Sequence, residues 1–144
     1  MSAVKNEVKL VFPSRSSNEG FIRSAAAAFC APMDPNLEEL GDIKTAVSEA
    51  VTNCIVHAYP DKLGLIRVRL RCLEGNVLEI QVRDSGRGIE NIETARKPMF
   101  TTGGADRSGM GFTIMESFMD AMRVRSAPGR GTTVTMRRRL NSRS

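Results

Sequence analysis

Glu49 and Asn53 are a carboxylate and a carboxamide placed four residues apart, in a stretch whose apolar residues have helical spacing. Both side chains therefore lie on one face of the expected helix. A carboxylate there can take a proton from a hydroxyl or water, and an amide oxygen suits a hard ion such as Mg²⁺. A solvent-facing polar pair is the simpler alternative, but flanking apolar residues place the pair near the seam between helix and sheet.

A second segment with chemical potential is Asp84, which ends an alternating apolar run and is followed by Gly86 and Gly88. Glycines let the backbone turn tightly and approach a flat ligand, and a carboxylate can accept a hydrogen bond from an exocyclic amine. Taken alone, the same residues also fit a surface turn closed by the aspartate side chain.

A third segment contains Gly109 and Gly111 before an expected helix. Free backbone amides and the helix dipole favour phosphate oxygens at such a position, although a plain helix start fits too. The spacing matches neither the P-loop nor the dinucleotide-binding motif. Arg107 lies where it could clamp a terminal phosphate, or it is an ordinary exposed arginine.

Two further polar residues accompany these segments. Thr132 directly follows Gly131 on the last expected strand, where it could bond a base edge or a bridging water, or simply favour a strand. His57, the only histidine, lies one turn beyond Asn53. A supporting structural role is favoured for it over catalysis.

The elements that must position these residues follow the order strand, helix, helix, strand, strand, loop, helix, strand, strand. This order predicts an α/β (α+β) two-layer sandwich, with a mixed, mostly antiparallel sheet covered on one face by helices. Asn18 is expected to cap the first helix, and Asp34, before a proline, to start the second, which runs to about Tyr59. Residues 85–108 show no regular period, which in a compact domain favours a functional loop.

Composition limits the class of protein. The 144 residues fit one domain, with 41% hydrophobic and 26% charged residues and a net charge of +5. Arginines that alternate with apolar residues, such as Arg67 and Arg69, are interpreted as the solvated face of a strand. Direct nucleic-acid binding is disfavoured because the chain has no Trp, one Tyr and no recognisable reading motif.

The cysteines and the apolar runs bear on the cellular location. Cys30, Cys54 and Cys72 are interpreted as small core residues in a reducing environment. No apolar run has the length of a membrane span and no signal peptide is recognisable, so a cytoplasmic protein is expected. The basic run Arg137–Arg139 is interpreted as a solvated strand end.

Together, the Glu-x-x-x-Asn helix, Asp-x-Gly-x-Gly, Gly-x-Gly and the final Gly-Thr resemble the ATP-binding fold shared by gyrase, Hsp90, histidine kinases and MutL. Residues 47–53, 98–102 and 107–116 further resemble the bacterial anti-sigma serine kinases, in particular the sporulation anti-sigma-F type. The resemblance covers about residues 5–138.

The resemblance implies specific roles. Glu49 would be the general base toward a serine hydroxyl, Asn53 a Mg²⁺ ligand and Asp84 the adenine anchor, while Arg107 would contact the γ-phosphate. The remaining nucleotide-binding residues would be Gly86, Gly88, Thr101, Thr102, Ser108, Gly109, Gly111 and Thr132. Residues 90–107 would form a lid over the ATP phosphates. The implied partners are a sigma factor, an anti-anti-sigma protein that is the serine substrate, and a second copy in a homodimer.

Other functions remain open at this point. A general-stress anti-sigma kinase, or a nucleotide-gated binding module without kinase turnover, would contain the same residues. A histidine-kinase catalytic domain is disfavoured because the single histidine lies inside the nucleotide helix. A hydrolase of the gyrase or MutL kind is disfavoured because the chain leaves no room for a transducer domain.

Overall fold

The computed structural model describes residues 3–60, 62–86, 110–127 and 129–140. Within these residues the strands form one five-stranded sheet in the order β1-β2-β3-β5-β4. The strands are β1 (Val4–Pro13), β2 (Leu65–Leu73), β3 (Val77–Asp84), β4 (Ala121–Ala127) and β5 (Gly131–Arg139). All four pairings are antiparallel, so the expected mixed character of the sheet is not observed.

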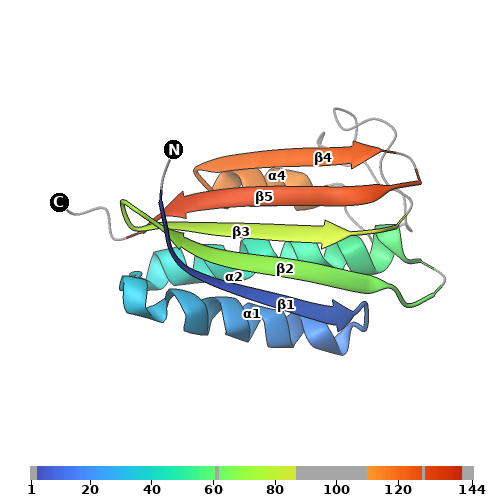
Figure 1. Ribbon diagram of the computed structural model, residues 1–144, viewed down its shortest axis with the longest axis horizontal. Helices are drawn as coiled ribbons and strands as arrows, with labels where there is room; N and C mark the ends of the chain where they lie inside the picture. The colour runs from blue at the N-terminus through green and yellow to red at the C-terminus, as the bar shows by residue number, and fades with distance from the viewer. Residues whose placement is uncertain (1–2, 61, 87–109, 128, 141–144) are drawn as a thin grey trace.

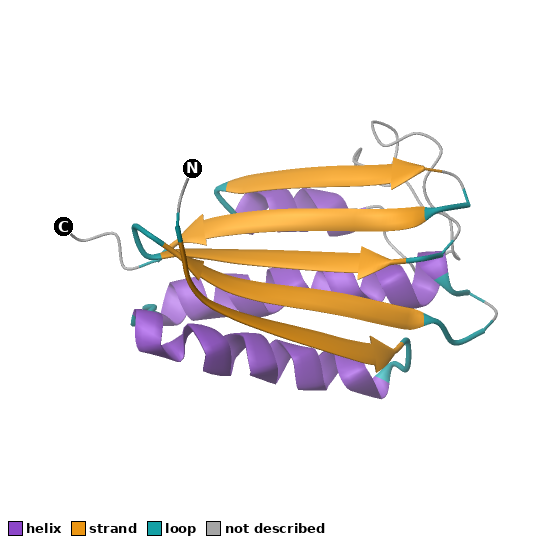
Figure 2. Cartoon of the chain, in the orientation of Figure 1, coloured by secondary structure: helices purple, strands orange, loops and turns teal. Residues whose placement is uncertain are grey.

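The helices α1 (Ser17–Cys30), α2 (Leu37–Asn53) and α4 (Met110–Phe118) lie together on one face of this sheet (Figures 1 and 2). The other face carries no helix from the described residues. This arrangement confirms the predicted two-layer α+β sandwich with helices on one face. It also brings the end of α2 and the end of β3 to the same end of the molecule, where the expected site lies.

The core lies between the two layers and follows the alternation of each strand. Ile66, Val68 and Leu70 of β2 are buried, whereas the intervening arginines are exposed or half-buried. The largest fully buried side chains from the helices are Ile22, Ile43, Val47, Val51 and Met115. Period two on the strands and helical spacing on α2 were both readable from the sequence, and both are confirmed.

The starts of the two long helices differ from the expectation. Asn18 lies inside α1. Its side-chain amide donates a hydrogen bond to the Pro13 carbonyl at 3.0 Å instead of capping the helix. Asp34 adopts a left-handed conformation at the end of a short turn. The cap of α2 is Asn36, whose side chain accepts from the Glu39 amide at 2.7 Å while Glu39 bonds back at 2.9 Å.

The end of α2 also differs. The α-helix stops at Asn53, and a wider π-helical turn follows over Cys54–Ala58. His57 lies in this turn, so it does not continue the regular spacing of Glu49 and Asn53. Such turns are frequent at functional sites because they redirect side chains within a helix.

Among the described residues, no helix is long and apolar enough to cross a lipid bilayer.

Candidate functional site

The Asp84 carboxylate is the centre of a compact cluster at the end of β3. The residue is buried, with 5% of its surface exposed. Its Oδ1 accepts hydrogen bonds from the backbone amides of Gly86 at 2.9 Å and Thr132 at 3.2 Å. Its Oδ2 accepts one from the thiol of Cys54 at 3.4 Å. The carboxylate is therefore held in one orientation by three separate elements.

The environment of Asp84 changes its acidity. Burial raises the pKa of this carboxyl above its ordinary value, and the donors from Gly86, Cys54 and Thr132 counteract part of that increase. Burial also raises the pKa of Cys54 well above its usual range, an effect to which the neighbouring carboxylate adds. The thiol consequently keeps its proton and remains a hydrogen-bond donor at neutral pH.

Two glycines allow this cluster to close, for different reasons. Gly131 has φ +96°, and a Cβ at this position would lie 2.1 Å from the Asp84 carbonyl oxygen. Gly86 does not have a positive φ; a Cβ there would lie 2.5 Å from both the Cβ and the carbonyl oxygen of Ala58. Gly86 is thus required for close packing against the end of the π-helical turn, and not for the tight turn expected from the sequence.

Tyr59 fixes the backbone that follows Asp84. Its hydroxyl accepts a hydrogen bond from the Ser85 amide at 2.7 Å and donates one to the Leu65 carbonyl at 2.8 Å. Gly64 lies directly on the tyrosine ring, where a Cβ would approach ring carbons to 2.2 Å. The turn after β3 is therefore held to the start of β2.

The structure brings only some of the predicted site residues into contact. Gly86 and Thr132 both contact Asp84 directly. Asn53 is the last residue of α2 and directly precedes Cys54 in the chain, while Glu49 lies one turn earlier; both are half-buried. The hydroxyl of Thr132 bonds Ser126 at 2.8 Å, so the contact of this residue with Asp84 is made by its backbone.

Several expected residues lie outside the described part of the chain: Gly88, Thr101, Thr102, Arg107, Ser108 and Gly109, together with the proposed lid at 90–107. Gly111 lies within α4, which begins at Met110, so it does not precede the helix as expected. No group of three potential metal-ligating His, Cys, Asp or Glu side chains occurs among the described residues.

Sequence reasoning missed Cys54, Tyr59 and Ser126 as members of this cluster. Cys54 was expected to be a plain core residue, and it is buried, but its partner is 30 positions away in the sequence. No local pattern indicates such a contact. Tyr59 is the only tyrosine in the sequence and directly precedes Pro60, and this is the one signal that could have drawn attention to it.

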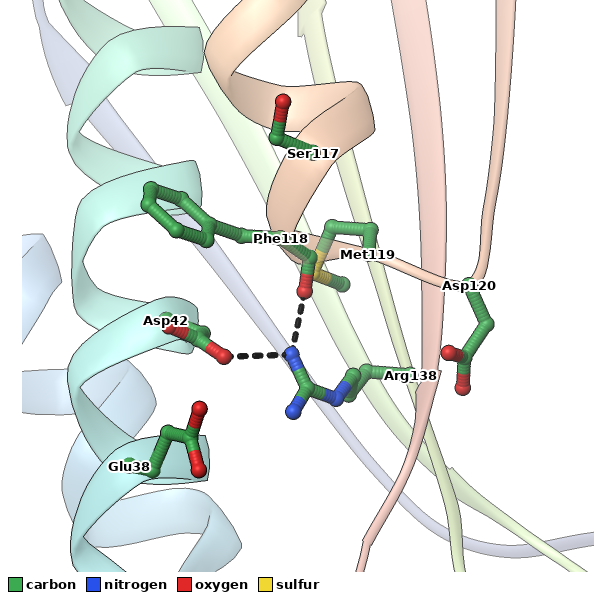
Figure 3. A pocket seen from close by; sticks show the side chains of 7 residues that line it. All are labelled: Glu38, Asp42, Ser117, Phe118, Met119, Asp120 and Arg138. Carbon is green, nitrogen blue, oxygen red and sulfur yellow. Dashed lines mark hydrogen bonds and ion pairs between the residues drawn. The ribbon is translucent and has the colours of Figure 1, made fainter.

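A separate cavity of about 370 Å³ lies at the opposite end of α2 (Figure 3). Arg138 donates hydrogen bonds there to Asp42 Oδ2 at 2.7 Å and to the Phe118 carbonyl, which ties β5 to α2 and α4. Arg138 is therefore not the solvated residue that its basic run suggested. At about 1.5 Å per residue, Asp42 is roughly 16 Å along the helix from Asn53, and none of the predicted site residues lines this cavity.

Comparison with known families agrees with the fold. The sequence model of the family described as histidine kinase-like ATPase domain matches residues 12–138 of this chain. The chain belongs to this family. Similarity at the level of the fold extends to the RsbU and RsbW domains of Rv1364c from Mycobacterium tuberculosis, with a TM-score of 0.70 at 20% identity over 94% of this chain and 33% of that longer one. The blue-light activated histidine kinase of Erythrobacter litoralis EL346 has a TM-score of 0.61 at 24% identity, over 89% of this chain and 42% of that one.

Within this family the chain groups with the anti-sigma F factors. The anti-sigma F factor of Thermoanaerobacter sp. (strain X514) is 51% identical over 138 residues, which are 95% of this chain and 96% of the relative. The anti-sigma F factor of Caldanaerobacter subterraneus subsp. tengcongensis is 54% identical over 132 residues, which are 91% of this chain and 92% of the relative. The resemblance inferred from the motifs is confirmed.

Proposed function

We propose that this chain is an anti-sigma factor that binds and inhibits a sporulation sigma factor of the sigma F type. In the same proposal it uses Mg-ATP to phosphorylate a serine of its anti-anti-sigma antagonist, and it acts as a cytoplasmic homodimer. The observation that carries the proposal is identity of 51% and 54%, over more than nine-tenths of the chain, to relatives named anti-sigma F factor.

The Asp84 cluster fits the adenine end of ATP. Among the described residues, Oδ1 already accepts two backbone hydrogen bonds, whereas Oδ2 accepts one, from the thiol of Cys54. A carboxylate oxygen has two acceptor sites, so Oδ2 can take one more donor, such as the exocyclic amine of adenine. The fixed orientation of the carboxylate means that little ordering is needed when the base binds.

Glu49 and Asn53 would act at the phosphate end. Bound Mg-ATP supplies the transferable phosphoryl group and a cation that offsets its charge. Asn53 would offer its amide oxygen to that cation, which takes few protein ligands. Glu49 would accept the proton of the substrate serine as the serine oxygen bonds to the γ-phosphorus and the bond from that phosphorus to the leaving ADP breaks. Arg107 would stabilise charge on the γ-phosphate. Gly88, Gly109 and Gly111, with Thr101, Thr102 and Ser108, would shape the nucleotide site beneath a lid at 90–107.

The decisive experiment compares the wild-type chain with Glu49→Gln and with Glu38→Gln, an exposed carboxylate on the same helix that serves as the matched control. Each is incubated with labelled ATP and a purified anti-anti-sigma protein, and phosphoserine is quantified. Loss of a general base lowers the rate about 10²- to 10⁴-fold. Glu49→Gln should show that loss with ATP affinity retained, and Glu38→Gln should match the wild type.

Unreduced phosphorylation by Glu49→Gln would remove this residue as the base. A wild-type chain that forms ATP-dependent complexes with the sigma factor but never yields phosphoserine would replace the kinase with a nucleotide-gated binding module. A wild-type chain that binds no sigma factor would contradict the anti-sigma proposal itself.

A further inference from the structure

The helix-free face of the sheet is strongly basic. Residues that alternate with the buried core positions point to this face, opposite α1, α2 and α4. Nine of them are cations: Lys9, Arg67, Arg69, Arg71, Arg83, Arg123, Arg125, Arg137 and Arg139. Among the described residues of the strands, the carboxylates that share this face are Glu7 and Glu79. The sequence alone suggested scattered solvated arginines and disfavoured nucleic-acid binding, but the fold collects these arginines on one surface and reopens that possibility.

The strand register sorts these charges into rows across the sheet. One row runs Glu7, Arg71, Glu79, Arg137, with successive residues directly opposite one another. Its members form ion pairs at 2.6 Å, 3.8 Å and 2.8 Å, and Arg69 reaches Glu79 from the next row at 3.2 Å. The acidic groups of the face are thus fully engaged in one row.

The two neighbouring rows hold cations without such partners. Arg67 lies directly opposite Arg83, and Thr133 separates Arg83 from Arg125. The row between this one and the paired row contains Lys9 and Arg123, together with Arg69. The five cations other than Arg69 are exposed, and no ion pair to any of them occurs within the described part of the chain. Like charges directly opposite each other on a sheet lower stability, so an external anion would relieve this pair.

We propose that the helix-free face binds the phosphate backbone of duplex nucleic acid without sequence preference. The contacts would be made by its unpaired cations, Arg67, Arg83, Arg125, Lys9 and Arg123. Cations on one strand repeat about every 6.6 Å, and neighbouring strands are about 4.8 Å apart. Duplex DNA has one negative charge per about 1.7 Å of its axis, so several phosphates fall within reach of the two rows. The threonine hydroxyls between the arginines add donors of the kind that contact phosphates.

The composition of the two rows disfavours other occupants. A specific protein interface needs a buried apolar or aromatic anchor, and apart from Val11 these rows contain only cations, Thr133, Thr135 and Gln81. A second copy of this face would bring like charges together. Single-stranded nucleic acid is bound largely by stacking on aromatic side chains, and this face has none.

The experiment measures fluorescence anisotropy of a labelled duplex of about 24 mixed base pairs, titrated with the full chain at several salt concentrations. The wild type should bind with a Kd on the order of 10⁻⁴ to 10⁻⁶ M near physiological salt, more tightly at lower salt. The triple variant Arg67→Gln, Arg83→Gln, Arg125→Gln should bind more than tenfold more weakly at low salt. Its salt slope should fall by about 0.9 for each phosphate that the variant no longer neutralises.

The matched control is Arg15→Gln, Lys62→Gln, Arg130→Gln, which removes the same charge from exposed positions off this face. It should retain affinity and slope close to the wild type. The proposal is overturned if both triple variants lose affinity equally, or if the wild type does not bind at low salt. Competition by poly-L-glutamate as effective as that by unlabelled duplex would also overturn it, since the face would then serve carboxylates. A wild-type chain that sediments as a dimer while the Arg67, Arg83, Arg125 variant sediments as a monomer would also overturn the proposal, because the face would then join two copies.

Discussion

The thiol of Cys54 donates a hydrogen bond to Oδ2 of Asp84 at 3.4 Å, which joins the end of the long helix to the end of β3. Both side chains are buried. This contact links the helix that carries Glu49 and Asn53 to the carboxylate proposed to bind adenine. Together with the contacts of Tyr59 with Ser85 and of Gly86 with Ala58, this hydrogen bond holds the two ends of the proposed nucleotide site together.

The first prediction is that Cys54→Ala lowers ATP affinity by about threefold to tenfold, because a buried carboxylate loses one of its donors. The thiol also lowers the pKa of Asp84, so its removal should raise that pKa. The acid-side midpoint, the pH at which ATP affinity has fallen to half on acidification, should therefore be higher in Cys54→Ala than in the wild type. Titration calorimetry across pH measures both effects. Cys54→Ser retains a donor and should restore the midpoint, whereas Cys30→Ala, a buried cysteine in α1, should leave it unchanged. Identical midpoints for Cys54→Ala and the wild type would contradict a positioning role.

The second prediction concerns stability and pH. Burial raises the folded-state pKa of Asp84 above 3.8, so the folded chain binds this proton more readily than the unfolded chain. The free energy of unfolding should accordingly fall as pH rises from 3.8 through the folded-state pKa. The stability lost in this range is not regained at neutral pH. Asp84→Asn should remove this dependence while weakening ATP binding. Urea unfolding at a series of pH values tests it, and an Asn variant that keeps the wild-type slope would disprove the assignment.

The third prediction separates two causes of glycine dependence in one turn. Gly129 has φ +78° with open space around its Cβ position, so Gly129→Ala should cost about 1 kcal/mol from backbone strain alone. Gly131→Ala combines a similar strain with a 2.1 Å contact to the Asp84 carbonyl oxygen. It should cost about 3 kcal/mol or more and should also lower ATP affinity. Equal costs in thermal unfolding would show that β5 moves away from Asp84 without difficulty.

The fourth prediction concerns the paired row on the open face of the sheet. The Glu79 side chain is 4% exposed and bonds Arg69, Arg71 and Arg137. Glu79→Gln should destabilise the chain by about 2 kcal/mol, because a buried charged acceptor is removed while its partners remain partly exposed. Glu7→Gln, an exposed member of the same row, is the control and should change stability little. Chemical denaturation compares them, and equal effects would mean that burial of Glu79 adds nothing.

Much of the fold followed from local patterns. Alternation placed β2 and β3 and their connecting turn, where Gly75 and Asn76 adopt the positive φ angles that such turns require. Helical spacing placed α1 and α2. The helix starts were less accurate because Asp34, Asn36 and Asn18 are all residue types that can cap, and only the neighbouring backbone decides which one does. That residues 1–144 form one domain stays a prediction.

By itself, the sequence determined the two-layer α+β class and the family, and it singled out Asp84, Gly86 and Thr132 as candidate site residues. Its motifs carried that information because their residue types are restricted by local chemistry. Only the tertiary structure decided that Cys54 and Tyr59 hold Asp84 and its turn, that Gly86 is needed against Ala58, and that the arginines of four strands share one face. These relationships join residues far apart in the sequence, so they depend on sheet register and packing and not on any local pattern.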